Sequence, residues 1–216
     1  MKGTFITFEG IEGSGKSTQI AMLANYLTAR GVRHVLTREP GGTLIGDQVR
    51  KILLDPVNRA LDPAAELLLY AASRAQHLRE IIIPALADGA IVLCDRFSDA
   101  TLAYQGYGRG LDTGMINALD RIVTAGLRPD LTLLFDIEAA PGIARARGRN
   151  KSRGLETEAR FENEELAFHE RVRQGYLTLV AQEPHRIRVV DASQSAEAIQ
   201  EKVRKIVDGR LGIGKS

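Results

Sequence analysis

The chain is poor in cysteine, in histidine and in long apolar runs. Its 216 residues include one cysteine, Cys94, and four histidines, which excludes an intramolecular disulfide and fits no zinc-ligand spacing. No apolar run approaches the ~20 residues of a membrane span, and strand-like residues follow Met1 directly, which leaves no room for a signal peptide. We therefore expect a cytoplasmic protein that is neither secreted nor bound to a membrane.

Neither sign of charge is in excess. The 29 Lys and Arg residues oppose 27 Asp and Glu residues, a formal net charge of +2, which argues against a protein that coats nucleic acid. A hydrophobic content of 44% in a chain of this length is enough for a core that buries roughly 70% of the unfolded surface. We expect residues 1–216 to form a single domain.

Short β-type runs alternate with longer segments of helical pattern. Strands are expected at 4–8, 33–37, 90–94, 131–136 and 186–191, and helices at 17–30, 63–83, 162–182 and 195–207. This alternation predicts an α/β fold in which helices flank a five-stranded parallel sheet. Two expected loops, 38–43 and 147–160, are longer than a simple connection requires, and long loops in such domains usually carry function.

A glycine-rich segment follows the first expected strand and leads into a helix, which favours a P-loop NTPase fold. Its residues match G-x-x-x-x-G-K-[ST] and are Gly10, Ile11, Glu12, Gly13, Ser14, Gly15, Lys16, Ser17 and Thr18. The glycines let backbone N–H groups turn toward a polyphosphate, and the helix adds its positive dipole end. We expect the segment to bind ATP, with Lys16 reaching the β- and γ-phosphates and Ser17 ligating Mg²⁺.

The pattern occurs a second time at the end of the chain, over residues 209–216. No helix can follow this copy, because the sequence ends at Ser216. We therefore expect a frayed tail without nucleotide-binding function.

A phosphate loop serves regulatory switches and transport ATPases as well as kinases. No D-x-x-G or L-S-G-G-Q segment is present, and the N-K-x-D position that would hold a carboxylate for guanine is Arg153. After the third expected strand come Asp95 and Arg96, which are placed to hold magnesium-bound water and a second phosphate. A salt-bridged surface pair is the alternative interpretation of these two residues.

Two further features suit an acceptor and a lid. Tyr70 and Arg74 are four residues apart on a helix and share a face, where they could bind a planar base or instead form part of the core and its rim. Arg145, Arg147, Arg149, Lys151 and Arg153 form a basic run without an acidic residue. Such a run suits a lid that brings an arginine over a transferring phosphoryl group. A solvated charge run or an RNA-contacting arm would have the same sequence pattern.

With these residues assembled, the sequence resembles thymidylate kinases of the bacterial type. Four segments carry the resemblance: the phosphate loop with Phe8 and Glu9, the R-E-P-G-G-T run within 37–43, the D-R-F and A-Y-Q-G runs at 95–97 and 103–106, and R-P-D-L-T at 128–132. The resemblance implies transfer of phosphate from ATP to dTMP with Mg²⁺, by a homodimer. A kinase of another nucleoside monophosphate, or a P-loop nucleotide-binding switch module, remains the alternative.

The resemblance also implies residue roles. Arg74 and Gln105 would bind the thymine edge, and Tyr70 would stack on the ring. Tyr104 would crowd the C2′ position of the sugar. Arg50 and Arg96 would hold the dTMP phosphate. The remaining implied members of the dTMP site are Glu39 and Thr101. The metal site would be Ser17 and Asp95. Because the phosphate loop carries Ile11 and Glu12, a lid arginine would act in the transition state, and the implied catalytic set is Lys16, Asp95, Arg96, Arg147, Arg149 and Arg153.

Overall fold

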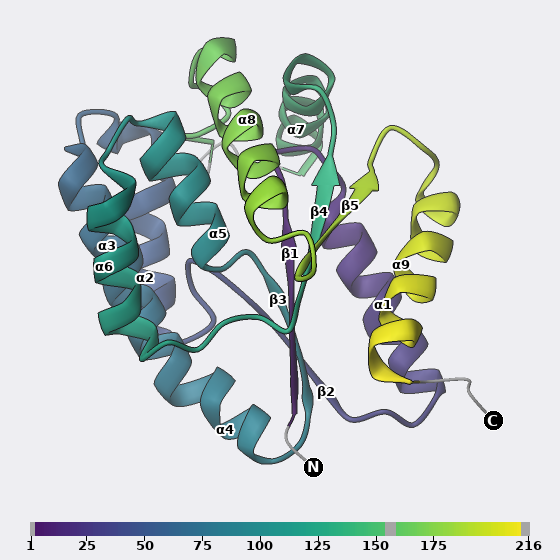
Figure 1. Ribbon diagram of the computed structural model, residues 1–216. Coiled ribbons are helices and arrows are strands. Elements are labelled where there is room, and N and C mark those ends of the chain that lie inside the picture. Colours follow the sequence, from purple (N-terminus) through teal and green to yellow (C-terminus); the bar gives the residue numbers. More distant parts are fainter. Residues whose placement is uncertain (1–2, 154–158, 213–216) are drawn as a thin grey trace.

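The computed structural model describes residues 3–153 and 159–212. Its centre is a five-stranded parallel sheet in the order β2, β3, β1, β4, β5 (Figure 1). The strands are β1 (Thr4–Glu9), β2 (His34–Arg38), β3 (Ile91–Asp95), β4 (Leu131–Asp136) and β5 (Ile187–Asp191). The predicted α/β architecture is confirmed, and each strand agrees with its expected range to within one residue.

The central strand β1 brings the site residues to one edge of the sheet. Its side chains Phe5, Ile6 and Phe8 are at most 1% exposed, so the strand is buried on both faces. Phe8 is in register with Asp95 of β3, and Arg38 of β2 is in register with the same residue. Because parallel strands end at a common edge, the carboxyl ends of β1, β2 and β3 meet where ligands bind in open α/β sheets.

Helices cover both faces of the sheet. Those between β1 and β3 are α1 (Lys16–Ala29), α2 (Leu44–Leu54), η1 (Pro56–Asn58), α3 (Pro63–His77), η2 (Leu78–Ile82) and α4 (Ile83–Ala87). Those that follow are α5 (Ser98–Thr101), η3 (Leu102–Gly108), α6 (Thr113–Thr124), α7 (Ala139–Arg153), α8 (Leu166–Gln182) and α9 (Ala196–Leu211). Helices α1 and α9 contact each other on one side, α3 contacts α2 and α6 on the other, and α7 and α8 stand near the strand ends (Figure 1). No helix in the described ranges is long and apolar enough to cross a bilayer.

The predicted helix over 63–83 begins where the sequence indicates and continues further. The Asp62 side chain accepts hydrogen bonds from the N–H groups of Ala64 and Ala65, and Pro63 occupies the first turn. The helix passes through the π-helical turn η2 into α4, which ends at Ala87 rather than at Ile83. Its apolar residues Leu78, Ile82 and Leu86 stay buried across this turn, and their burial offsets the irregular backbone.

The predicted long loop over 147–160 is wrong for residues 147–153, which form the end of α7. Alanine and arginine have high helix propensity, so a basic run can be helical as readily as it can be a loop. The predicted helix at 162–182 starts too early, because α8 begins at Leu166 and the Glu162 carboxylate is bound by Asn150 instead. The prediction of a frayed tail is also wrong for residues 209–211, which complete α9. Residues 213–216 lie outside the described part of the chain.

Candidate active site

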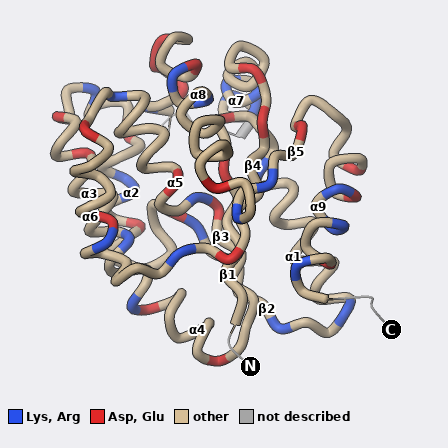
Figure 2. The backbone as a smooth tube through the Cα atoms, in the orientation of Figure 1, with Lys and Arg blue, Asp and Glu red and all other residues tan. Residues whose placement is uncertain are grey.

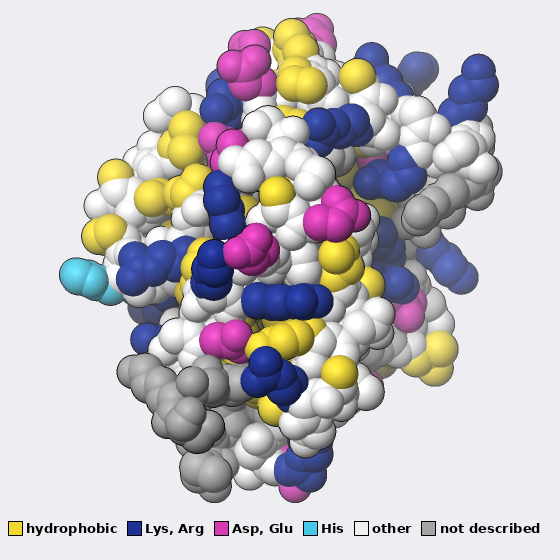
Figure 3. Space-filling model, turned by 90° about the vertical axis from the view of Figure 1, so that its right-hand side faces the viewer, with side chains coloured by type: hydrophobic (Ala, Val, Ile, Leu, Met, Phe, Trp, Pro, Cys, Tyr) yellow, Lys and Arg dark blue, Asp and Glu magenta, His cyan; other side chains and the backbone are white. Residues whose placement is uncertain are grey.

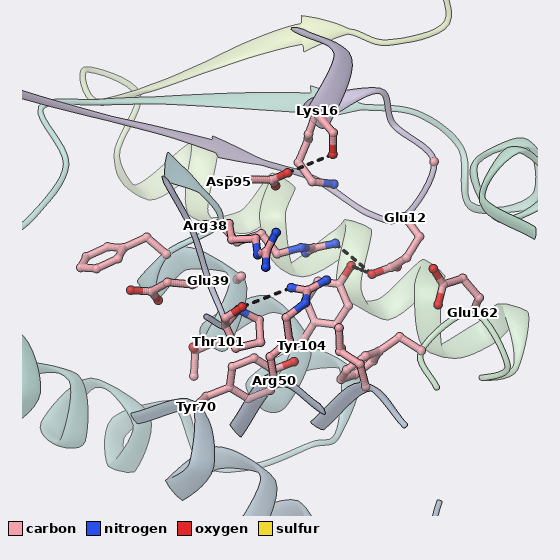
Figure 4. Close-up of a pocket in the computed structure, with 18 of the residues that line it drawn as sticks. Glu12, Lys16, Arg38, Glu39, Arg50, Tyr70, Asp95, Thr101, Tyr104 and Glu162 are labelled. Atoms are coloured by element: carbon pink, nitrogen blue, oxygen red, sulfur yellow. Dashed lines mark hydrogen bonds and ion pairs between the residues drawn. The ribbon is translucent and has the colours of Figure 1, made fainter. Parts of the chain in front are cut away.

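A cavity of about 360 Å³ opens at the carboxyl ends of β1, β2 and β3 (Figure 4). Most of the residues that the sequence singles out line it, drawn from segments far apart in the chain: Glu12, Gly13, Gly15, Lys16, Ser17, Thr18, Glu39, Arg50, Tyr70, Arg74, Asp95, Arg96, Thr101, Tyr104, Gln105 and Arg149. Gly10, Ile11, Ser14 and Arg147 are not part of its wall. Residues that the sequence interpretation did not single out also line the cavity, among them Arg38, Phe161 and Glu162.

The phosphate loop depends on glycine conformations and on close packing. Gly13 has a φ of 72°, and a Cβ added there would lie 1.9 Å from the carbonyl oxygen of Gly142, so any side chain would push α7 away from the loop. Gly15 has a φ of 87° and precedes α1, whose first N–H groups therefore open toward the cavity. The segment has the strand, tight turn and helix that phosphate binding requires.

Lys16 places its ammonium group inside the loop. Its Nζ donates to the carbonyl oxygens of Gly10 at 2.9 Å and Ile11 at 2.8 Å, and to the Ser14 hydroxyl at 3.2 Å. Burial, together with the nearby Arg96 guanidinium, lowers the pKa of Lys16 to about 8. An anion in the loop would remove this penalty, since it would supply the negative charge that the buried ammonium lacks.

Ser17 and Asp95 meet beside the loop. The Ser17 hydroxyl donates to the Asp95 carboxylate at 3.1 Å, and Asp95 is the last residue of β3 (Figure 4). Hydroxyl and carboxylate oxygens are the ligands that Mg²⁺ prefers, and it usually takes one or two from protein and the rest from water and phosphate. The described residues contain no group of three or more Asp, Glu, His or Cys side chains that could hold a metal unaided. The pair thus fits a magnesium ion that a nucleotide brings with it.

Arg96 is held in a strained backbone conformation in the middle of the cavity. Its φ is +71°, which is uncommon for a residue with a side chain and is concentrated at functional sites. Its guanidinium donates to the Glu12 carboxylate at 2.9 Å and to the Tyr176 hydroxyl at 3.3 Å, and lies 4.6 Å from the centre of the Tyr104 ring. The turn at Arg96 therefore directs its positive charge across the cavity toward the phosphate loop.

Glu12 links the loop to this arginine. Burial by itself would raise the pKa of Glu12, but the positive charges of Arg96 and Lys16 and the hydrogen-bond donors around the carboxylate together outweigh burial. They hold the pKa well below its usual range, so the group is ionised. Its Oε1 also accepts from the Tyr104 hydroxyl at 2.6 Å, and its Oε2 lies 3.4 Å from Nδ1 of the buried His169 on α8. The carboxylate in the loop thus orients the predicted phosphate and sugar residues.

The far end of the cavity is built on Arg74, which is 3% exposed. Its Nε donates to Glu39 at 2.8 Å, its Nη2 to the Thr101 hydroxyl at 2.8 Å and its Nη1 to Asp120 at 3.3 Å. These bonds fix the plane of the guanidinium while the five N–H donors of arginine leave some for a ligand. Tyr70, one turn earlier on α3, lines the same region, as the four-residue spacing predicts.

The lid arginines differ in where their side chains lie. Arg149 lines the cavity and contacts Asn150 at 3.0 Å. Arg147 instead donates to the carbonyl oxygen of Glu162 at 3.1 and 2.8 Å, which commits its guanidinium to the backbone. The side chain of Arg153 lies outside the described part of the chain. Of the three predicted candidates, Arg149 is therefore the one seen on the cavity wall.

Glu9 was not singled out as a site residue from the sequence, although its place after the apolar run of β1 was a signal. It is fully buried and accepts from the backbone N–H of Phe97 at 2.7 Å and the hydroxyl of Tyr176 at 2.8 Å. Burial, reinforced by the negative charge of Asp99, raises the pKa of Glu9 to about 8. Glu9 is therefore mostly protonated at neutral pH and orients Tyr176, which contacts Arg96.

Glu9→Gln is expected to change how stability depends on pH. Between pH 4.5, its ordinary pKa, and about 8 the folded protein keeps a proton on Glu9 that the unfolded chain loses, so the free energy of unfolding falls as pH rises. Glu9 contributes at most ~1.4 kcal/mol per pH unit to the slope of the free energy of unfolding with pH. Glutamine imitates the neutral acid, so the variant should gain stability over wild type across this range. Urea unfolding at several pH values measures the difference.

The matched control is Glu201→Gln, because Glu201 is exposed on α9 and its partner among the described residues is Lys205. This change should leave the slope of stability with pH between about 5 and 8 as in wild type. Parallel stability curves for wild type and the Glu9 variant would show that Glu9 is ionised in the folded protein.

Comparison with known proteins agrees with this geometry. A family model described as thymidylate kinase matches residues 8–203. The thymidylate kinase of Trichlorobacter lovleyi is 56% identical over 209 residues, which cover 97% of this chain and 99% of that protein. The corresponding values for the thymidylate kinase of Geobacter sulfurreducens are 54%, 97% and 98%. The solved structure of thymidylate kinase from Ehrlichia chaffeensis matches with a TM-score of 0.76 at 37% identity, over 96% of this chain and 99% of that one. The chain belongs to the thymidylate kinase family.

Proposed function

We propose that the protein transfers the γ-phosphoryl group of ATP to dTMP, which yields ADP and dTDP. The observation that carries the proposal is one cavity lined both by the phosphate loop and by the predicted acceptor residues. Lys16 lies at one end, Tyr70 and Thr101 lie at the other (Figure 4), and Arg96, Arg74 and Gln105 also line the wall. A regulatory switch needs the first end alone. A kinase needs both, because donor and acceptor phosphates must meet in line.

The phosphate end of the site neutralises charge. Lys16 and the N–H groups at the start of α1 would face the β- and γ-phosphates of ATP, and Ser17 and Asp95 would hold the Mg²⁺ that accompanies it. That ion would shield the charge of the phosphate oxygens. Arg149 would approach the transferring group from α7, where it already lines the cavity. Most of the rate enhancement in phosphoryl transfer comes from such positioning and electrostatic stabilisation.

The acceptor end positions dTMP. Arg50 and Arg96 would hold its phosphate, and Arg50 is anchored by a bond of 3.2 Å to the Pro40 carbonyl oxygen. Tyr104 is held by Glu12 and packed 5.4 Å from the ring of Phe161, so it is a rigid wall against a 2′-hydroxyl. No general base is required, since a phosphate monoester with a second pKa of about 6 is already mostly dianionic at pH 7.

The proposal includes a single nucleoside monophosphate kinase domain over 1–216, with the lid at 147–160 formed in part by the end of α7. It also includes a cytoplasmic location, where ATP is available and the one cysteine, buried Cys94, stays reduced. Charges of both signs are spread over much of the chain, as Figure 2 shows, whereas α7 carries basic residues alone, which suits a small anionic substrate bound at one cationic site.

A homodimer is part of the same proposal, and α2, α3 and α6 would form its interface. Exposed apolar side chains on this side include Leu44, Leu68 and Ile122, of which Ile122 is 79% exposed. On the opposite side, over α1 and α9, hydrophobic side chains lie among charged ones (Figure 3). Large apolar side chains exposed on neighbouring helices are typical of subunit interfaces.

Ile122→Glu is accordingly expected to convert the dimer to a monomer, because it would bury a charge at the interface. Sedimentation equilibrium at micromolar concentrations measures the mass. Val189→Glu is the control, since Val189 is 46% exposed on the edge strand β5, outside the three helices of the proposed interface, and its replacement should leave the dimer intact. A monomeric wild-type protein would refute the dimer without affecting the proposed reaction.

The experiment that tests the reaction is an ADP-release assay with ATP and a panel of nucleoside monophosphates. Efficient turnover is expected with dTMP and weaker turnover with UMP, dCMP, dAMP and dGMP. Preference for another monophosphate would redirect the proposal to that substrate. ATP hydrolysis that no monophosphate stimulates would instead favour a switch module.

A further inference from the structure

Glu66 lies beyond the cavity wall and has no part in the proposed reaction, yet it is the most heavily bonded carboxylate of this region. It belongs to the first turn of α3 and is 0% exposed. Arg109 donates to both of its oxygens at 3.2 Å, and Arg160 donates to Oε2 at 2.5 Å. Its remaining described partner is Gln105, whose Nε2 donates to Oε1 at 2.8 Å.

The bond to Gln105 fixes the direction of an amide. A carboxylate held between two guanidinium groups accepts hydrogen bonds and cannot donate them. The nitrogen of the Gln105 amide must therefore face Glu66. The oxygen and nitrogen of a side-chain amide are similar in size, and it is the hydrogen-bond partner that decides which of them lies where. The carbonyl oxygen diverges from the nitrogen by about 120° and points elsewhere. Gln105 is 1% exposed and lines the cavity, so the oxygen available to a ligand is an acceptor.

Arg74 provides the opposite polarity on the same wall. Its guanidinium is anchored by Glu39, Asp120 and Thr101 and can only donate. A base edge that meets Arg74 and Gln105 together must offer an acceptor to the first and a donor to the second. The imide edge of thymine or uracil does so, with a carbonyl beside a ring N–H. Cytosine presents the reverse pattern, an amino group beside a ring acceptor.

We infer that Glu66 is a positioning residue that determines the choice of pyrimidine: by binding the amide nitrogen of Gln105 it keeps the carbonyl oxygen toward the substrate, which selects a base with a ring N–H over cytosine. This inference rests on the proposed function, because it concerns the acceptor base. Glu66 itself does not contact the substrate. A base with the reverse pattern of donors and acceptors would leave buried polar groups unpaired. Such unpaired groups discriminate against a wrong substrate more strongly than a difference in size does.

The test is the ratio of kcat/KM for dTMP to kcat/KM for dCMP in Glu66→Gln. Glutamine has the same shape but can donate, so the Gln105 amide is free to turn and present its nitrogen. We expect the ratio to fall by about tenfold or more, through a higher KM for dTMP. Arg109→Lys disturbs the same carboxylate without removing it, and should leave the ratio within about twofold of wild type.

A double-mutant cycle separates this role from a purely structural one. In a Gln105→Met background Glu66 has no amide to orient, so Glu66→Gln should then leave the ratio unchanged. An unchanged ratio in the single variant, or an equal fall in both backgrounds, would overturn the inference. Should Glu66→Gln not fold, Glu66→Asp, whose retracted carboxylate breaks the 2.8 Å bond, takes its place with the same expectation. Wild-type protein that does not phosphorylate dTMP would refute the proposed function instead.

Discussion

Replacing Lys16 by alanine is expected to lower kcat by about 10³-fold or more, because a preorganised cation at a transferring phosphoryl group contributes most of its effect in the transition state. The structure supports this size of effect: Nζ lies within the loop, in hydrogen-bond contact with Gly10, Ile11 and Ser14, so its charge is fixed where the polyphosphate would bind. Loss of these contacts should cost only ~1–3 kcal/mol of stability.

Single-turnover measurement of ADP formation, with circular dichroism to show that the variant is folded, tests this expectation. Lys205→Ala is the matched control, since Lys205 is an exposed lysine on α9 whose described partner is Glu201. That change should leave kcat within about twofold of wild type. Kinase activity close to wild type in the Lys16 variant would remove the assignment of the loop.

Arg74→Ala is expected to raise the KM for dTMP by about 10²-fold or more and the KM for ATP by much less. Arg74 lies at the acceptor end of the cavity, away from the phosphate loop, and its loss removes the donor for the base. It also leaves Glu39 and Asp120 without the charge that faces them, and breaking a buried pair in this way typically costs ~3–5 kcal/mol. The variant should therefore be both weaker in dTMP binding and less stable.

Steady-state kinetics at a temperature where the variant is folded separate the two effects. Arg33→Ala serves as control, because Arg33 and Asp88 form a surface pair that is 61% and 75% exposed and contributes ~0–1 kcal/mol. An equal rise in the KM of both substrates would indicate general damage to the fold. An unchanged KM for dTMP would mean that the base binds elsewhere.

Much of this molecule follows from local sequence. The strands could be placed because apolar runs such as that in β1 must be buried, and burial on both faces leaves little freedom of register. The phosphate loop could be placed because Gly13, Gly15 and Lys16 act within a few residues of one another. Asp62 and Pro63 fixed the start of α3 for the same reason, since a helix cap is satisfied by its own neighbours.

Other features were wrong or missed because their cause lies in distant residues. Residues 147–153, the end of α7, are predicted to be part of a loop because their basic run carries no apolar stripe that would indicate a helix. The same helix packs against the phosphate loop through Gly142. The start of α8 was misplaced because Glu162 bonds Asn150. The side-chain positions of Arg147 and Arg149 could not be separated either, since they depend on the backbone of residue 162 and on the cavity.

By itself, then, the sequence determined the sheet, the phosphate loop and the residue types that face phosphate and base, since each follows from propensity, burial or motif over short stretches of chain. Only the tertiary structure decided how those residues are held. The raised pKa of Glu9, the anchoring of Arg74 and the direction of the Gln105 amide arise from partners 27 to 167 residues away. Such contacts exist only once parallel strands and their helices bring their ends together, and no local pattern encodes them.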